Sequence, residues 1–591
     1  MRQSYLLLHD PHGLDPEVLH RAQHDEYLRL LVRSNALALF VSEGTRALQL
    51  PHGVIIVGDL YSHDSQPVLD ANQLYCDGTD AAFQRRILND FWGEYIVVSP
   101  DRHNPPGFSV MRSPSHACEL PCLYSTTGGA SFVTSDISLA LRLGIYRKHI
   151  DFHTLAHRLV YPSLKATRTG LSEISELLPG CSIQICEGRV RVDQSWCPWD
   201  FVGAANAYED PGEATIAVRS TIESVVSTLA SQDGAVLLEL SGGLDSSIIA
   251  ACLKRSPAQV KCATLTAPVP GADEREYADP IAAMLGTELI TTEVAFDDAS
   301  LEFSIPPSTV NPAVGALQHV SDKLMEATAA RVDANSYFSG AGGDTVFCYL
   351  TDASPAADAF RSAGVSQGLR TLHDLSTLHQ CTYWKAGRLA LKKLLPSSAL
   401  PYRADMSLMP QSAALPEPER HPWLTPPKGS LPGDRQRVFE LSATQLFRDS
   451  CPRTLNRPVR MPLLTQPVIE ACLKAPSWMW FSGAQNRAIA RQAFADALPP
   501  TIYARKSKGT FTGFLGALYR RNRSGMRDFL LDGELHARGL LDADALIQFT
   551  HGELPRGDGS FMRIFQICAM ENWVRQQLRI PTRLNINPGE R

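Results

Sequence analysis

The chain has 591 residues, of which 44% are apolar and 20% are charged, and its formal net charge is −6 at pH 7. This composition is typical of a folded protein of several large units, and it excludes a small scaffold that needs disulfides or metals to hold it together. The small negative charge gives no basic field that would steer the whole chain onto nucleic acid or an anionic membrane. We therefore expect any bound anion to be held by a local site.

Thirteen cysteines are scattered through the chain, and none forms a Cys-x-x-Cys pair. We interpret them as reduced thiols that pack as small apolar side chains, as in a cytoplasmic protein. Cys118 with Cys122, and Cys181 with Cys186, leave a disulfide or half of a metal site open. The apolar run near the N-terminus is too short for a signal peptide and no segment reaches 18 apolar residues, so we expect a cytoplasmic protein with no membrane span.

Up to about residue 200 the sequence is typical of β-structure. Short apolar runs, separated by clusters of Pro, Gly, Asn and Asp, occur at 36–42, 53–61, 94–99 and 181–192. Helical periodicity is rarer and is clearest at 80–90 and 151–160. We therefore predict an α+β unit built on layers of β-strands.

After a Gly-, Ala- and Pro-rich stretch at 201–212 strands and helices alternate, which is the pattern of a parallel sheet. Strands are expected at 235–240, 260–267, 288–294 and 336–338. Helices are expected at 246–254, 273–285 and 313–330, the second with an acidic start, Asp273-Glu274, that suits the helix dipole. Such strands and helices form a doubly wound α/β sheet, which binds ligands beyond the carboxyl ends of its strands.

From about 395 to 434 the chain is rich in Pro, Ser and Leu, and we expect no regular structure there. An irregular surface connection and a loop that covers substrate or binds a partner both stay open. Helical periodicity then continues to about 580. We divide the chain into two large units, 1–205 and 206–591, the second with a helical C-terminal part.

The strongest chemical signal is Ser241-Gly-Gly-Leu-Asp-Ser-Ser247, between a buried strand and a helix. The two glycines let backbone N–H groups turn inward as an anion nest, and the helix N-terminus and the serine hydroxyls add to it. It is not a Walker A loop, because no Gly-Lys-[Ser/Thr] follows. The sequence therefore predicts a phosphate site in which Asp245 holds Mg²⁺ against the phosphates.

This loop resembles the pyrophosphate-binding S-G-G-x-D-S signature of ATP pyrophosphatases, which split ATP into AMP and pyrophosphate. Ser339-Gly-Ala-Gly-Gly-Asp344 resembles the second glycine loop of their asparagine synthetase branch, where the first Ser-Gly contacts the nucleotide and the final Asp binds Mg²⁺. Five further segments follow the order of the closing helical part of that branch: Arg460–Leu464, Val468–Glu470, Asn486-Arg487, Leu498-Pro499 and Arg505–Gly509. In that branch, this part holds a lysine that stabilises the acyl-adenylate.

The first unit resembles the class II glutamine amidotransferase domain that precedes an asparagine synthetase domain, at Phe91–Tyr95, Phe132–Asp136 and Glu176–Gly180. That domain uses a cysteine at position 2 as its nucleophile, whereas this chain has Arg2 there and its first cysteine is Cys76. Ser4 would serve only after an unexpected cleavage. The resemblance therefore implies an inactive unit, a structural or substrate-docking remnant that hydrolyses no glutamine.

A second departure is Ala341, which stands where asparagine synthetases have a glutamate and leaves room beside the adenylate. Both departures resemble relatives that use an internal amine, the β-lactam synthetases and, closer in the glycine loop and in the R-x-S-K-G segment, the lasso-peptide cyclases. Such a cyclase adenylates an Asp or Glu side chain of a ribosomal precursor peptide, whose N-terminal amine then closes an isopeptide ring. An α-amine, with a pKa of about 7.7–8.0, needs no strong general base.

The resemblance implies ATP and Mg²⁺ as cofactors and a role for each site residue. The phosphates are assigned to Ser241, Gly242, Gly243 and Ser246, the Mg²⁺ to Asp245 and Asp344, and the adenosine to Leu240, Leu265, Ser339 and Gly340. Lys506 and Lys508 both lie near the position of the lysine, and Lys508 is slightly favoured because it precedes Gly509. A solvated basic run is the alternative for this segment.

The implied partners are a ribosomal precursor peptide and a leader-peptide protease or maturation protein. Two other functions stay open: a small-molecule amide synthetase, either for β-lactam closure or for ammonia-dependent asparagine synthesis, and a scaffold without catalysis. Asp245, Asp344 and both glycine loops argue against the scaffold. The basic cluster Tyr519–Arg523 is interpreted as an exposed helix end, with attraction of an acidic leader peptide or of phosphate as its alternative.

Overall fold

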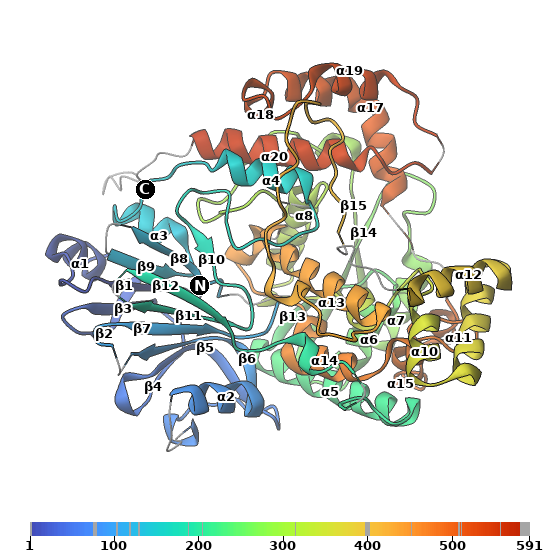
Figure 1. Ribbon diagram of the computed structural model, residues 1–591, viewed down its shortest axis with the longest axis horizontal. Helices are drawn as coiled ribbons and strands as arrows, with labels where there is room; N and C mark the ends of the chain where they lie inside the picture. Colours follow the sequence, from blue (N-terminus) through green and yellow to red (C-terminus); the bar gives the residue numbers. More distant parts are fainter. Residues whose placement is uncertain are drawn as a thin grey trace.

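The computed structural model describes residues 3–74, 80–101, 104–116, 120–127, 130–186, 188–203, 205–313, 315–395, 402–450, 452–505, 509, 511–555 and 557–579. Two antiparallel sheets from the first two hundred residues lie on one side of the molecule, and a parallel sheet with most of the helices lies on the other (Figure 1). No helix among the described residues is long and apolar enough to cross a membrane.

The first two hundred residues form two six-stranded antiparallel sheets. One has the order β10 (Ser175–Glu176), β8 (Leu123–Thr127), β9 (Ala130–Thr134), β1 (Tyr5–His9), β3 (Leu37–Ser42), β2 (Leu28–Arg33). The other has the order β12 (Arg189–Gln194), β11 (Cys181–Cys186), β7 (Phe108–Arg112), β6 (Phe91–Pro100), β5 (Ile55–Ser62), β4 (Ala47–Gln49). Four helices accompany them: α1 (Pro16–Gln23), α2 (Asp80–Asp90), α3 (Ile137–Arg142) and α4 (Phe152–Val160). The predicted apolar runs and both predicted helices lie in these elements.

The central strands are buried on both faces, which explains why their sequences are continuous apolar runs and do not alternate. In β1, Tyr5 and Leu7 pack into the layer between the two sheets, whereas Leu6 and Leu8 pack into a core that includes C-terminal helices. In β6, Ile96 and Val98 face the layer between the sheets, whereas Tyr95 and Val97 face a core shared with the parallel sheet. Successive strand residues point to opposite faces, so later parts of the chain cover both outer faces.

The parallel sheet has five strands, one more than the sequence predicts. Its order is β15 (Leu289–Glu293), β14 (Gln259–Thr266), β13 (Ala235–Glu239), β16 (Ser336–Ser339), β17 (Val459–Arg460). The missed strand β17 pairs Val459 with Tyr337 and Arg460 with Phe338. A two-residue strand has no periodicity to detect. The strand order reverses between β13 and β16, and ligands bind such sheets in the crevice outside the carboxyl ends at this point.

Helices before and between these strands are α5 (Pro211–Asp233), α6 (Leu244–Leu253), α7 (Arg275–Met284) and α8 (Gln318–Arg331). Three predicted starts were wrong. α6 begins at Leu244, two residues before the predicted start and directly after Gly243. α8 begins at Gln318, five residues late, because Leu317 has a left-handed backbone with φ of 57°. α7 begins at Arg275, because Asp273 forms an ion pair with the Arg275 side chain at 2.6 Å and lies outside the helix.

Helices follow to the end of the described chain, interrupted as predicted between 402 and 431, where only a short 3-10 turn at Pro422–Leu424 forms. They are α9 (Gly343–Val346), α10 (Ser354–Ser362), α11 (Val365–Leu378), α12 (Tyr383–Leu394), α13 (Pro432–Thr444), α14 (Gln466–Lys474), α15 (Ala488–Ala493), α16 (Pro500–Tyr503), α17 (Thr512–Leu531), α18 (Glu534–Ala537), α19 (Ala543–His551) and α20 (Met562–Arg579).

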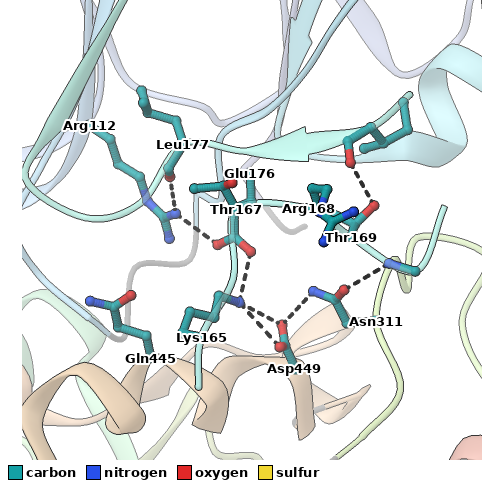
Figure 2. A network of polar contacts seen from close by, with 12 residues as sticks. Arg112, Lys165, Thr167, Arg168, Thr169, Glu176, Leu177, Asn311, Gln445 and Asp449 are labelled. Carbon is teal, nitrogen blue, oxygen red and sulfur yellow. Dashed lines mark hydrogen bonds and ion pairs between the residues drawn. The ribbon is translucent and has the colours of Figure 1, made fainter. Parts of the chain in front are cut away.

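A buried network of ion pairs and hydrogen bonds connects the antiparallel sheets to the rest of the chain (Figure 2). Lys165 lies between two carboxylates, 2.8 Å from Glu176 and 3.2 Å from Asp449, and Arg112 contacts Glu176 at 2.9 Å. Asn311 donates to Asp449 at 3.2 Å. Burial alone would raise the pKa of Glu176, but the charges and hydrogen bonds of Lys165 and Arg112 together outweigh it and lower that pKa.

The described cysteines are free thiols, as interpreted from the sequence. Cys181 and Cys186, one of the two pairs for which a disulfide stayed open, are both free. Cys118, in the other pair, lies outside the described residues.

Candidate active site

The first glycine loop follows β13 and opens α6, as predicted. Ser241 and Ser246 face each other across it, with their hydroxyl oxygens 3.2 Å apart, and the Ser241 N–H donates to the Ser246 hydroxyl at 3.3 Å. Gly242 has φ of 66°, and a Cβ there would lie 2.6 Å from the Cβ of Tyr277. A side chain at Gly242 would be strained and would clash, so this turn requires glycine.

The second glycine loop follows β16 and packs directly on the first turn of α6. A Cβ at Gly340 would lie 2.6 Å from the Ser246 backbone nitrogen, and one at Gly343 would lie 2.4 Å from Cγ of Asp245. Because β13 and β16 are adjacent, with Glu239 opposite Ser339, both loops leave the sheet at the same edge. The glycines of the second loop therefore allow the two loops to touch.

A cavity of about 360 Å³ lies at this edge of the sheet and is lined by both loops. Asp245, assigned to Mg²⁺, lines it together with seven of the eight residues assigned to the phosphates or to adenosine: Leu240, Ser241, Gly243, Ser246, Leu265, Ser339 and Gly340. Ala341 lines it too, whereas Gly242 and Asp344 are not among its lining residues. Its size and its mixture of apolar and polar walls are typical of sites for small ligands.

Two carboxylates predicted to bind Mg²⁺ are brought together by an arginine. Nη1 of Arg487 donates to Asp344 at 2.8 Å and to Asp245 at 3.3 Å, and its guanidinium lies 5.0 Å from the centre of the Tyr349 ring. Arg487 is buried and has a left-handed backbone, with φ of 54°. Non-glycine residues in this conformation cluster at functional sites.

The donor set fits the predicted metal. Mg²⁺ is usually held by one or two carboxylates together with substrate phosphates, and Asp245 and Asp344 are two such carboxylates beside a phosphate loop. Among the described residues no group of three or more His, Cys, Asp or Glu side chains suits a metal ion. Phosphate oxygens would therefore have to complete the coordination.

Two more arginines hold the closing segment against the first glycine loop. Arg505 donates to the Gly242 carbonyl oxygen at 2.9 Å, forms an ion pair with Glu274, and stacks 3.7 Å from the centre of the Tyr277 ring. Arg491 donates to the Arg505 carbonyl oxygen at 2.8 Å. Burial, with the neighbouring charge of Arg487, lowers the pKa of Arg491 to about 10.

The two predicted lysines, Lys506 and Lys508, lie outside the described residues. The residues on either side of that segment, Arg505 and Gly509, both line the cavity. The solvated alternative for the segment is therefore not decided, and the choice between the lysines stays a prediction.

No binding or catalytic role is predicted from the sequence for Arg487, Arg491, Arg505 and Glu274, all of which line the cavity. Glu274 is the N-cap residue of α7, where an acidic side chain suits the helix dipole as predicted, and it also pairs with Arg505, 231 residues later. The one sequence feature that points to Arg487 and Arg505 is the order of the closing motifs that contain them, and this order does not show what the two arginines contact.

Comparison with known proteins gives a family and two distant structures. The family model described as asparagine synthase matches residues 217–575. The chain is similar, at 9% identity over 49% of this chain and 80% of that chain, to the allosteric regulatory enzyme of purine biosynthesis, with a TM-score of 0.22. It is similar, at 10% identity over 49% and 75%, to glutamine phosphoribosylpyrophosphate amidotransferase from B. subtilis with ADP and GMP, with a TM-score of 0.19. No curated protein matches the chain.

Proposed function

This chain belongs to the asparagine synthase family, whose members form amide bonds at the expense of ATP, and from that premise we propose that it closes a macrolactam ring in a ribosomal lasso-peptide precursor. The side-chain carboxylate of an Asp or Glu in the peptide attacks the α-phosphorus of ATP and releases pyrophosphate. The N-terminal amine of the same peptide then attacks the acyl carbon, forms the isopeptide bond and releases AMP. The observation that carries the proposal is the single cavity shared by both glycine loops and Ala341.

The first loop and its serines act on the phosphates. Ser241, Gly243 and Ser246 line the cavity with hydroxyls and the start of α6, and this arrangement supplies the donors that phosphate oxygens require. Mg²⁺, when bound, neutralises the charge of the leaving pyrophosphate. Asp245 and Asp344 would hold it, since their carboxylates already share one cation.

Arg487 and Arg505 add positive charge to the same wall. Both residues line the cavity, so their guanidinium groups place positive charge beside the phosphates of the bound nucleotide. We assign Lys508, with Lys506 as its alternative, to charge stabilisation at the reacting acyl group.

The substrate class rests on Ala341. Ala341 lines the cavity with a methyl group where the resemblance leads us to expect a glutamate, which leaves space beside the reacting acyl group. We place the attacking nitrogen on the substrate itself, as in the relatives that use an internal amine. A peptide with a free N-terminal amine supplies it, and a leader-peptide protease in the cytoplasm would generate that amine.

The test uses the full chain with Mg-ATP and a precursor peptide encoded beside its gene, supplied with a leader protease. The expected products are AMP, pyrophosphate and a peptide lighter by one water. N-acetylation of the processed peptide should abolish ring closure but leave the carboxylate-dependent exchange of pyrophosphate into ATP. Replacing the acceptor Asp or Glu of the peptide by its amide should abolish both.

Asp245→Ala tests the role of the enzyme's own carboxylate. Asp273→Ala, which removes an exposed carboxylate of the same chain, is its matched control. We expect turnover to fall at least about 10³-fold in the first variant and to stay unchanged in the second. Release of ADP, or turnover of aspartate with ammonia but of no peptide, would overturn the proposal in favour of another amide synthetase.

A further inference from the structure

Helix α12 exposes its large apolar side chains and buries small ones, which is the reverse of an ordinary surface helix. Such a helix buries its large apolar side chains and turns its polar ones toward water. The residues that α12 buries are small, Ala386 and Ala390, which are 4% and 2% exposed. Its large residue Trp384 is 89% exposed, and Leu391 and Leu395 are 62% and 61% exposed. The spacing of these three positions places them along one side of the helix.

The neighbouring helix also exposes large apolar side chains. α11 packs against α12, and its Val365 and Leu369 are 68% and 53% exposed. Of the 17 large apolar side chains exposed in the described ranges, 7 lie between residues 365 and 395. Soluble proteins rarely expose contiguous apolar patches unless something covers them. The two helices lie at the outer edge of the molecule, far from the antiparallel sheets (Figure 1).

This segment is also a basic region of a protein with a net negative charge. Between residues 361 and 395 there are 6 Lys and Arg residues against 1 Asp, although the whole chain carries a net charge of −6. Lys393 forms an ion pair with Asp352 at 2.5 Å. Lys385, Arg388 and Lys392 are exposed and form no ion pair with the described residues. The charge of the patch is therefore complementary to an anionic surface.

The residue types favour a lipid surface over a protein partner. Lysine is depleted in protein–protein interfaces, yet three of the four basic residues of α12 are lysines. Lys and Arg beside Trp and Leu are typical of helices that lie in the plane of an anionic bilayer, where tryptophan settles at the level of the headgroups. Lysines next to such a surface are attracted to anionic lipids.

We propose that the hairpin of α11 and α12 docks onto the surface of an anionic lipid bilayer. Trp384, Leu391 and Leu395 enter the headgroup region, and Lys385, Arg388 and Lys392 contact the anionic headgroups. None of these six residues lines the glycine-loop cavity, so the inference stands apart from the proposed function. The helix packs through small side chains because its large ones contact lipid.

The experiment is vesicle sedimentation with the full chain. We expect binding to vesicles of equimolar phosphatidylcholine and phosphatidylglycerol at low salt, no binding to phosphatidylcholine alone, and release by high salt. Trp384→Gln with Leu391→Gln should lower the partition coefficient at least about tenfold, and Lys385→Glu with Lys392→Glu by as much or more. Ile216→Gln, which changes an equally exposed side chain of α5, is the matched control and should bind like the parent.

Both double variants should keep the parental melting temperature, since they change exposed side chains only, and the parental turnover in the absence of vesicles. Absence of vesicle binding by the parent overturns the proposal, as does equal loss of binding in Ile216→Gln. Binding of poly-L-glutamate but not of vesicles, abolished by the Trp384 and Leu391 changes, would overturn it in favour of an acidic protein partner.

Discussion

The same local arrangement, one cation between two carboxylates, occurs in two regions of this molecule. At the glycine loops Arg487 lies between Asp245 and Asp344, and at the junction with the antiparallel sheets Lys165 lies between Glu176 and Asp449. The arrangements differ in access. The Asp344 side chain is 35% exposed and the adjoining cavity measures about 360 Å³, whereas the Glu176 and Asp449 side chains are each 8% exposed and their neighbouring cavity measures about 80 Å³.

This difference in access distinguishes a ligand-binding site from a structural contact. A buried triad beside a cavity of only about 80 Å³ has no room for a nucleotide, and it holds two segments together at a high desolvation cost that its own hydrogen bonds must offset. A triad at the wall of a large cavity keeps its carboxylates in place until a ligand competes for them. Charge type and pairing alone therefore do not identify an active site, whereas the size of the adjoining space does.

The largest effect is expected at the junction, for Lys165→Met. The change removes the shared cation and leaves Glu176 with Arg112 and Asp449 with Arg158 at 3.6 Å, so it should lower the free energy of unfolding by about 2–3 kcal/mol. Urea unfolding measures it. Lys165→Arg keeps a cation between the two carboxylates and should recover part of the loss. A stability equal to the parent's in Lys165→Met would show that the junction triad fastens nothing.

At the cavity, Arg487→Met removes the corresponding cation. We expect this change to lower turnover strongly and the free energy of unfolding only slightly. Asp344 can be hydrated, so we expect a stability loss of only about 1 kcal/mol. Turnover should fall about 100-fold because the phosphate wall loses a positive charge. Steady-state kinetics and urea unfolding measure the two effects, and Arg487→Lys should rescue part of the turnover. A large loss of stability with normal turnover would make Arg487 a structural residue like Lys165.

Gly340→Ala tests the contact between the two glycine loops. The added Cβ would lie 2.6 Å from the Ser246 backbone nitrogen, so the loops must separate, at a cost of about 1–3 kcal/mol in stability. The KM for ATP should rise, since Ser246 lines the cavity. Gly525→Ala in α17, where a Cβ meets nothing within 4 Å, is the control and should stabilise by about 0.5–1 kcal/mol. Equal behaviour of the two variants would contradict the close packing of the loops.

A structural feature can be predicted from the sequence when the residues that form it are contiguous. The strand, the glycine nest and the helix around Asp245 are contiguous, so they are predicted together with the position of the cavity. Strand β17 has two residues and pairs with Tyr337 and Phe338, more than a hundred residues earlier, so nothing local marks it. The same holds for Lys165 and Asp449, which are 284 residues apart.

The role of Arg487 and the orientation of α12 could not be predicted for a different reason. The closing motif contains Arg487, but its contact with two carboxylates depends on a left-handed backbone that no residue type at that position indicates. The apolar stripe of α12 has the same periodicity whether it faces the core or water. Only the packing of Ala386 and Ala390 shows which face is inside.

The smallest effect is the pH dependence of the junction. The net lowering of the Glu176 pKa by Lys165 and Arg112 means that the ionised carboxylate stabilises the folded chain at neutral pH. This stabilisation is lost as the pH falls below the ordinary value of 4.5 toward the lowered one. Glu176→Gln removes this titration, so its free energy of unfolding should fall less steeply between about pH 5 and pH 3 than the parent's. Urea midpoints across that range measure the slopes, and equal slopes would mean that the junction carboxylate carries no net electrostatic stabilisation.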